Sequence, residues 1–215
     1  MIEKVKQTTS EKLLLALFIV LGLVAIYIFL ILPQKCLFVK DYNPKELSFK
    51  KPKNIVVLNI ECGNVIIELY PENSPKSVER FKMLISLGKY NDIAFHRVIK
   101  NVLVQSGDLE FGKKDNYNYL YIGTGKSGFG TLRSELNEQI EFVRGTVGLA
   151  RTSKLDTEDS QFFILLQDAP LFKEEYTPVG KVIYGLEILD TITDDHRREY
   201  VLRPDFINSF SLFEK

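Results

Sequence analysis

The residues best suited to chemistry are concentrated in two stretches of the sequence, FHRVIKNVLVQSGD at 95–108 and RGTVGLARTSKLDTEDSQFFILL at 144–166. The usual reactive arrangements are missing from the chain. No Gly-x-Ser-x-Gly nucleophile motif occurs, Cys62 has no neighbouring histidine, and His96 and His196 lack the spacing of zinc ligands. We therefore expect neither covalent nor metal-dependent catalysis, and no metal or other cofactor.

The turn-rich segment Gly123–Ser127 (GTGKS) invites comparison with a phosphate-binding loop. The Walker pattern G-x-x-x-x-G-K-[ST] requires its first glycine where this chain has Leu120. We interpret the segment as a turn whose glycines allow positive φ.

Taken together and in this order, the two stretches resemble the cyclophilins, the peptidyl-prolyl cis-trans isomerases built on an eight-stranded antiparallel barrel closed by two helices. Phe-His-Arg followed by Gln-x-Gly-Asp, with Ser-Gln-Phe-Phe downstream, is a specific combination. The likeness covers about Ile55–Phe213 and includes SPKSVERF, GTGKSGFG and VGKVIYGLEILD. The resemblance implies peptidyl-prolyl isomerase activity on proline-containing polypeptides.

The chemistry of that reaction suits the residues present. Rotation about a prolyl amide must overcome a resonance barrier of about 18 to 20 kcal/mol but breaks no bond. What helps is a hydrogen-bond donor aimed at the prolyl nitrogen in a dry apolar cup. Arg97 suits the donor role because its guanidinium is always charged and directional, and it matches the catalytic arginine of the family. The alternative is that Arg97 is only a surface charge on a strand.

The resemblance also implies roles for other residues. Gln105 matches the glutamine that holds the substrate backbone and orients the arginine, Phe163 matches the floor of the proline pocket, and Leu103 forms an apolar wall. The backbone at Ala150 and Arg151 matches the edge that pairs with an extended peptide. The remaining positions expected to bind substrate are Val102, Gln161, Leu171, Phe172 and Tyr176.

Several of these positions depart from the family pattern, among them Leu103 for a frequent methionine and Arg151 for a frequent asparagine. Val102 replaces a frequent phenylalanine, while Leu171 and Tyr176 stand, by ungapped alignment, where tryptophan and histidine are frequent. We therefore expect a proline cup that is shallower on one side. Because the family's tryptophan helps to bind the cyclic peptide cyclosporin, we also expect weak cyclosporin binding.

Two neighbouring residues have structural interpretations. We expect His96 to be packed and hydrogen-bonded within the barrel rather than to act as a base, because the reaction requires no proton transfer. Alternation along a strand sends one of Phe162 and Phe163 inward and the other outward. The resemblance places Phe163 in the cleft.

The elements that must position these residues are mainly short strands. Asn54–Ile60 and Asn64–Tyr70 indicate a hairpin. A helix is predicted that Asn73 or Ser74 can cap, that has Val78, Phe81 and Ile85 along one face, and that ends at Gly88. A second short helix is predicted at Leu186–Ile192. Further strand-like runs lie at Ala94–Ile99, Val102–Gln105, Thr146–Ala150, Phe162–Leu166, Val179–Tyr184 and Phe206–Phe213. This pattern predicts a closed antiparallel barrel or a sandwich. The resemblance favours a mainly β, closed eight-stranded barrel capped by two helices, with residues 54–215 as the isomerase domain.

The N-terminal part has a different composition. Residues 13–32 form a run of twenty residues without a charge, long enough at 1.5 Å per residue to cross a ~30 Å hydrocarbon core. We predict a single transmembrane helix at 13–32, embedded in the lipid bilayer after a tail at 1–12. A cleaved signal peptide is the alternative, but its apolar region is shorter and a small-residue cleavage site follows it.

A basic tether at 33–53 joins the two parts, with six lysines against Asp41 and Glu46. It is either a solvated spacer or a contact for anionic lipid headgroups. Cys36, just beyond the predicted span, is either inert or lipid-modified. Cys62 is expected to be an unpaired thiol.

We therefore expect a monomeric, membrane-anchored isomerase that assists folding by accelerating the slow X-Pro interconversion. The alternative is a catalytically weak proline-directed binding module or chaperone on the same barrel. No nucleic-acid partner is expected, because 28 basic residues are balanced by 28 acidic ones. The counts of flanking lysines do not settle the topology. An apolar segment so near the N-terminus usually acts as a signal anchor, which favours a domain in the lumen of the endoplasmic reticulum or Golgi.

Overall fold

The computed structural model describes residues 8–31, 35–195 and 199–214. The tail at 1–7, the residues at 32–34 where the predicted span ends, and His196 lie outside this description. The chain divides into two compact units, Met1–Phe38 and Val39–Lys215.

The first unit is built on helix α1 (Thr9–Ile26), which continues as a π-helical turn, η1 (Tyr27–Ile31). A capping box begins the helix, because the Thr8 backbone N–H donates to the Glu11 carboxylate at 2.7 Å and the Glu11 N–H donates to Thr8 Oγ1. Within Thr9–Leu30, an 18-residue window has a mean hydropathy of 3.1, and none of that window is buried. By length and composition, this helix is able to cross a membrane.

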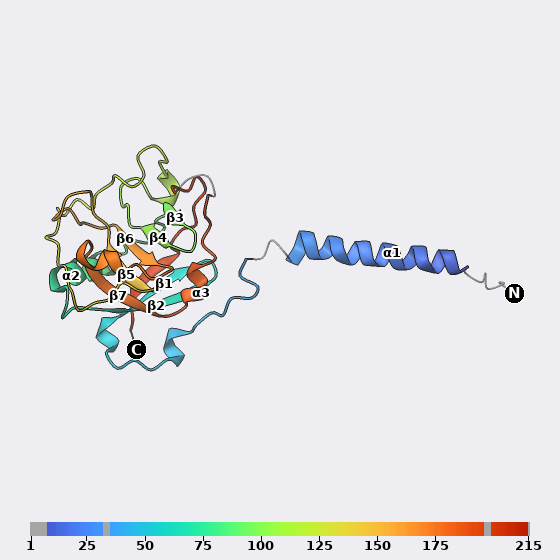
Figure 1. Cartoon of the computed structure of the whole chain (residues 1–215), viewed down its shortest axis with the longest axis horizontal. Helices are drawn as coiled ribbons and strands as arrows, with labels where there is room; N and C mark the ends of the chain where they lie inside the picture. The colour runs from blue at the N-terminus through green and yellow to red at the C-terminus, as the bar shows by residue number, and fades with distance from the viewer. Residues whose placement is uncertain (1–7, 32–34, 196–198, 215) are drawn as a thin grey trace. The chain divides into compact units, whose positions relative to one another are not determined.

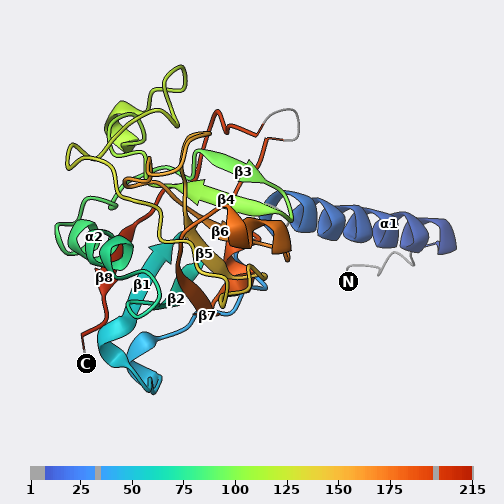
Figure 2. The same cartoon turned by 60° about the vertical axis from the view of Figure 1, so that its left-hand side comes forward.

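The second unit contains one eight-stranded antiparallel sheet, with α2 packed beside β8 (Figures 1 and 2). The strand order is β3-β4-β6-β5-β7-β2-β1-β8. The strands are β1 (Ile55–Ile60), β2 (Gly63–Leu69), β3 (Arg97–Ile99), β4 (Leu103–Ser106), β5 (Thr146–Leu149), β6 (Phe162–Leu165), β7 (Pro178–Tyr184) and β8 (Ser209–Leu212). The helices are α2 (Pro75–Ser86) and α3 (Leu186–Leu189), and the short helical turns are η2 (Pro44–Glu46), η3 (Pro52–Asn54), η4 (Lys114–Asn116) and η5 (Pro170–Glu174).

The expectation of a closed barrel is wrong, because the sheet is an open half-barrel with β3 and β8 at its two ends. Irregular backbone occupies the place where those ends would pair. The Asp92 N–H donates to the Ile207 carbonyl at 2.7 Å, the Phe95 N–H donates to the Asp205 carbonyl at 2.9 Å, and Ala94 forms a bridge with Phe206. These bonds provide partners for the backbone N–H groups that precede β3, although no regular strand ladder forms there.

Helix α2 covers the core, as its apolar spacing predicts. Phe81 lies within 5.5 Å, centroid to centroid, of the rings of Tyr90, Phe162 and Phe210. The cap differs from the expected one, since the Ser74 hydroxyl donates to the Pro178 carbonyl instead of accepting from the helix. The Glu135 carboxylate takes its place and accepts the Lys76 N–H at 3.2 Å and the Ser77 N–H at 2.8 Å.

The second compact unit starts at Val39, so it includes the last part of the predicted tether as well as the predicted isomerase domain. Asp41 Oδ1 accepts the Asn64 N–H at 2.8 Å, and Gly63 has a φ of +132° at a place where a Cβ would lie 2.4 Å from that oxygen. The hairpin between β1 and β2 therefore holds the tether.

The expectation of an unpaired thiol at Cys62 is also wrong. The structure has Cys62 disulfide-bonded, and Cys36 is disulfide-bonded as well. A thiol held in a disulfide cannot carry a thioester-linked lipid, so the lipid-modified alternative for Cys36 is not the state observed.

Candidate functional site

Strand pairing places the three proposed catalytic residues in one row across the sheet. Arg97 on β3 lies opposite Gln105 on β4, and Gln105 lies opposite Phe163 on β6. Residues directly opposite in a ladder point to the same face of the sheet. Phe162, the next residue along β6, points to the other face and packs against Phe81 in the core, so the predicted alternation is observed.

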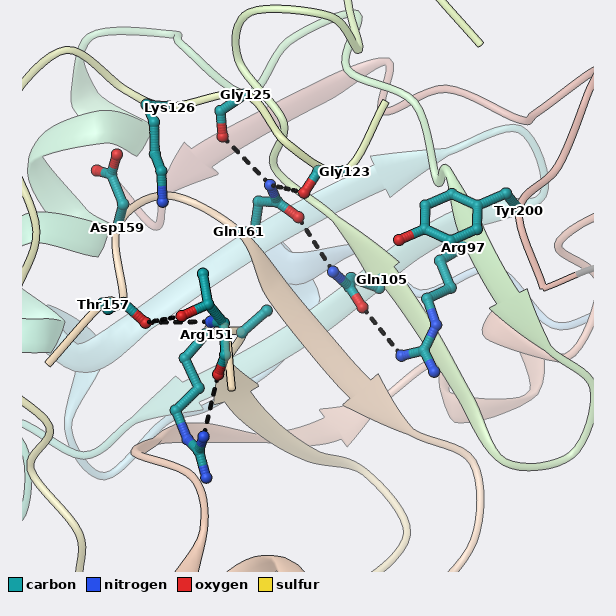
Figure 3. Close-up of a pocket in the computed structure, with 12 residues that line it drawn as sticks. Arg97, Gln105, Gly123, Gly125, Lys126, Arg151, Thr157, Asp159, Gln161 and Tyr200 are labelled. Atoms are coloured by element: carbon teal, nitrogen blue, oxygen red, sulfur yellow. Dashed lines mark hydrogen bonds between the residues drawn. The ribbon is translucent and has the colours of Figure 1, made fainter. Parts of the chain in front are cut away.

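A chain of hydrogen bonds joins the two polar members of this row, Arg97 and Gln105, to Gln161 (Figure 3). Arg97 Nη1 donates to Gln105 Oε1 at 3.2 Å, and Gln105 Nε2 donates to Gln161 Oε1 at 3.1 Å. Gln161 Nε2 in turn donates to the carbonyls of Gly123 and Gly125. The GTG turn at one end thus orients the guanidinium at the other.

The GTG turn is kept next to Gln161 and Gln105 by hydrogen bonds to the Asp108 carboxylate. Asp108 is fully buried, and its Oδ2 accepts the N–H groups of Gly123 at 2.7 Å and of Gly125 at 3.0 Å. A Cβ on Gly125 would lie 2.0 Å from Asp108 Oδ1. The Gln-x-Gly-Asp motif therefore connects β4, which carries Gln105, to the loop that contains Gly123 and Gly125.

A cavity of about 220 Å³ extends from Arg97 and Gln105 toward the turn. The sequence had already assigned Gln161, Ala150 and Arg151 to substrate binding, and these residues line it. Its other lining residues were not predicted: Gly123, Gly125, Lys126, Thr152, Thr157, Asp159 and Tyr200. The GTGKSGFG resemblance was a usable signal for Lys126, whereas nothing in the sequence pointed to Tyr200.

The apolar side of the site is an aromatic cluster around Phe163, which is only 3% exposed. The Tyr176 ring lies 5.1 Å and the Phe172 ring 5.7 Å from the Phe163 ring, centroid to centroid. The apolar residues that complete the cluster are Leu103, Phe142, Leu165, Ile99, Val102, Ala150 and Ala169. The cup is thus filled by its own aromatic side chains rather than shallow on one side.

Leu171 is not brought into this cluster, because its side chain is 85% exposed on η5. Arg151 reaches the cluster from the opposite direction. Its guanidinium lies 5.0 Å from the Tyr176 ring centroid, and its Nε donates to the Glu175 carbonyl at 2.6 Å. The backbone N–H of Ala150 already donates to the Gln161 carbonyl at 2.8 Å.

Burial defines the charge state of His96, which lies next to Arg97 on the chain and is inaccessible to solvent. Desolvation lowers its pKa from 6.5 to about 4, although the nearby Asp108 carboxylate acts in the opposite direction. Neither ring nitrogen makes a hydrogen bond of good geometry among the described residues, although polar contacts with the Ala94 backbone and the Gln161 side chain also act to raise the pKa. His96 is therefore a neutral, packed residue near pH 7, as expected.

An antiparallel half-barrel that presents an arginine, a glutamine and a phenylalanine in one row has the architecture of a cyclophilin. A family model, "Cyclophilin type peptidyl-prolyl cis-trans isomerase/CLD", matches residues 55–211. The chain therefore belongs to the cyclophilin-type peptidyl-prolyl cis-trans isomerases, and its function is that of a peptidyl-prolyl isomerase.

Individual relatives agree with this assignment. A probable peptidyl-prolyl cis-trans isomerase of Brucella suis is 41% identical over 163 residues, which cover 74% of this chain and 83% of the relative. Peptidyl-prolyl cis-trans isomerase-like 3 of Gallus gallus is 36% identical over 154 residues, covering 69% and 88%. The crystal structure of a Cryptosporidium parvum cyclophilin-type isomerase in the presence of the dipeptide Ala-Pro has a TM-score of 0.65 at 24% identity. It covers 75% of this chain and 99% of its own, and it supports the fold.

Proposed function

We propose that Arg97 is the catalytic donor of this isomerase, and that Gln105 and Phe163 complete the catalytic group. The observation that carries the proposal is the cross-strand row of these three residues. When the prolyl amide twists, the nitrogen lone pair localises and becomes a hydrogen-bond acceptor. A guanidinium N–H aimed at that nitrogen stabilises the twisted state more than the planar one, which is the condition for catalysis.

In this proposal Gln105 has two functions. Its Oε1 accepts from Arg97 at 3.2 Å and orients the guanidinium. Its Nε2 donates one N–H to Gln161 Oε1 and keeps a second N–H for the substrate backbone in the cavity that Gln105 lines. Phe163 forms the floor under the proline ring. Phe163 is only 3% exposed, with the rings of Tyr176 and Phe172 packed against it, so a proline ring reaches that floor only if side chains of this cluster move.

The test compares the full-length wild-type chain with Arg97→Ala in a protease-coupled or NMR-exchange assay on an X-Pro peptide. Loss of one aimed donor should lower kcat/KM roughly ten- to a thousandfold, or about 1.4 to 4 kcal/mol. Arg133→Ala, which removes an exposed arginine, is the matched control and should leave kcat/KM unchanged. Equal activity of wild type and Arg97→Ala would contradict the role of Arg97. Peptide binding without exchange in the wild type would favour the binding module.

We also propose that the apolar helix is an uncleaved membrane anchor and that the isomerase domain lies on the non-cytosolic side, in the lumen of the secretory pathway. The length and hydropathy of Thr9–Leu30 support the anchor. The disulfide-bonded state of Cys36 and Cys62 supports the location, because disulfides persist in oxidising compartments and are rare in the cytosol.

Protease protection on sealed membrane vesicles tests this location. The domain should resist protease until detergent is added, and Cys62 should react with an alkylating reagent only after reduction. Digestion of the domain without detergent would place it in the cytosol. A mature chain whose mass lacks the apolar segment would identify that segment as a signal peptide.

A further inference from the structure

Arg97 has a second partner that the proposed mechanism does not use. Its Nε donates to Glu199 Oε2 at 2.8 Å, and its Nη2 lies 2.8 Å from the same oxygen. Gln105 Oε1 accepts a hydrogen bond from Nη1, on the other side of the guanidinium. The guanidinium plane is therefore held from two sides, by a carboxylate and by an amide.

Backbone hydrogen bonds with β3 hold Glu199 next to Arg97. The Val98 N–H donates to the Glu199 carbonyl at 2.9 Å, and the Val201 N–H donates to the His96 carbonyl at 2.9 Å. Tyr200 forms an antiparallel bridge with Arg97 itself, and its ring lies beside the arginine in Figure 3. Residues 199–201 thus extend the sheet by pairing with the outer edge of β3.

The geometry leaves the guanidinium able to act on a substrate. Each terminal nitrogen carries two N–H groups, so Nη1 keeps a second N–H after it has donated to Gln105. The side chain of Arg97 is 28% exposed and that of Glu199 is 56% exposed. An ion pair so exposed adds little to folding stability, so its effect lies in the orientation of the arginine.

We propose that Glu199 is a positioning residue for the isomerase reaction, which fixes the guanidinium of Arg97 so that its free N–H points at the prolyl nitrogen. This inference rests on the proposed catalytic role of Arg97. If the guanidinium were held from one side alone, it would also adopt orientations in which its N–H does not reach the nitrogen of the twisted amide. Small misplacements of catalytic groups lower reaction rates strongly.

The experiment measures isomerase activity of the full-length chain with Glu199→Ala, Glu199→Gln and the control Glu72→Ala. Glu72 is also an exposed glutamate in an ion pair, with Lys51 at 3.1 Å. We expect Glu199→Ala to lower kcat roughly three- to thirtyfold with little change in KM. Glu199→Gln should lower kcat less, because its amide oxygen still accepts a hydrogen bond from Arg97. Glu72→Ala should have the kcat and KM of wild type.

Two further readouts separate positioning from a general structural effect. In an Arg97→Ala background, Glu199→Ala should have no additional effect on kcat/KM, because the group that it orients is gone. The NMR signal of the Arg97 Nε–H, which Glu199 accepts in wild type, should shift and exchange faster with water in Glu199→Ala.

The possible failures are distinguishable. If Arg97→Ala is impaired while Glu199→Ala has wild-type activity, the inference is overturned and the proposed function stands. If Glu199→Ala is equally harmful with and without Arg97, Glu199 acts through the fold and the inference is again overturned. If Arg97→Ala itself has wild-type activity, the role of Arg97 and the inference fall together.

Discussion

Lowering the pH from 7.5 to 5 should destabilise the folded domain through one residue, His96. Its side chain is inaccessible to solvent, and burial lowers its pKa from 6.5 to about 4. Below pH 6.5 the unfolded chain binds a proton at this histidine, whereas the folded chain does not until the pH approaches 4. The stabilisation from His96 is therefore complete above pH 6.5 and is lost as the pH falls.

The size of the effect follows from the two pKa values. Each pH unit in this window changes the unfolding free energy by up to about 1.4 kcal/mol. Integrated from pH 7.5 to pH 5, the contribution of His96 is about 2 kcal/mol. The two charged groups that face His96, Asp108 and Arg97, act in opposite directions on its pKa and do not cancel the burial.

The assay is chemical unfolding of the full-length chain in detergent, followed by near-ultraviolet circular dichroism of tyrosine and phenylalanine, because the chain has no tryptophan. The control is His96→Phe, which keeps an aromatic ring of similar size but does not titrate. Between pH 7.5 and pH 5, the unfolding free energy of wild type should fall by about 2 kcal/mol more than that of His96→Phe.

An equal loss in both proteins would refute the reasoning, as would a wild type that gains stability on acidification. If His96→Phe does not fold, the histidine ring proton titrated by NMR in wild type gives the folded-state pKa directly. A value near 6.5 there would show that burial does not control this residue.

Two further predictions concern the rim of the site and the start of α2. Cyclosporin should bind wild type weakly, and Leu171→Trp should bind it roughly tenfold more tightly, because the exposed Leu171 offers neither an indole donor nor the contact area of an indole. Calorimetric titration measures both affinities, and tight binding by wild type would contradict the prediction. Glu135→Ala should lower the unfolding free energy by about 1 kcal/mol in thermal denaturation, because it removes the acceptor for two N–H groups at the N-terminus of α2. The exposed Glu79→Ala on the same helix should change it far less, and equal losses would contradict the capping role.

The parts of the site that follow from local pattern were predictable from the sequence. Strand alternation separated Phe162 from Phe163, and the period of α2 placed Phe81 in the core. The contacts that were missed join residues far apart in the chain. Arg97 and Glu199 are separated by 102 positions, and no periodicity near Glu199 indicates a strand. Only the folded backbone, which pairs the edge of β3 with this segment, brings them together.

The filled cup was missed for a different reason. The sequence shows each aromatic residue separately, and it presents Tyr176 only as a departure from the family's frequent histidine. In the fold, the same residue turns inward, where Arg151 lies against its ring at 5.0 Å and Phe163 packs beneath it. Side-chain direction depends on such neighbours, which alignment alone does not supply.

Gly148 shows how local sequence and tertiary pairing combine to set the floor of the site. It lies opposite Phe163 on the neighbouring strand β5, and a Cβ there would come within 2.5 Å of the Phe163 ring. Glycine ordinarily weakens a strand, so the T-V-G-L sequence alone gives no reason for it. The reason is the ring next to it: the space that glycine leaves allows Phe163 to lie against the sheet, in line with Gln105 and Arg97. The alignment of the three side chains that we propose as catalytic thus depends on a residue that has no side chain.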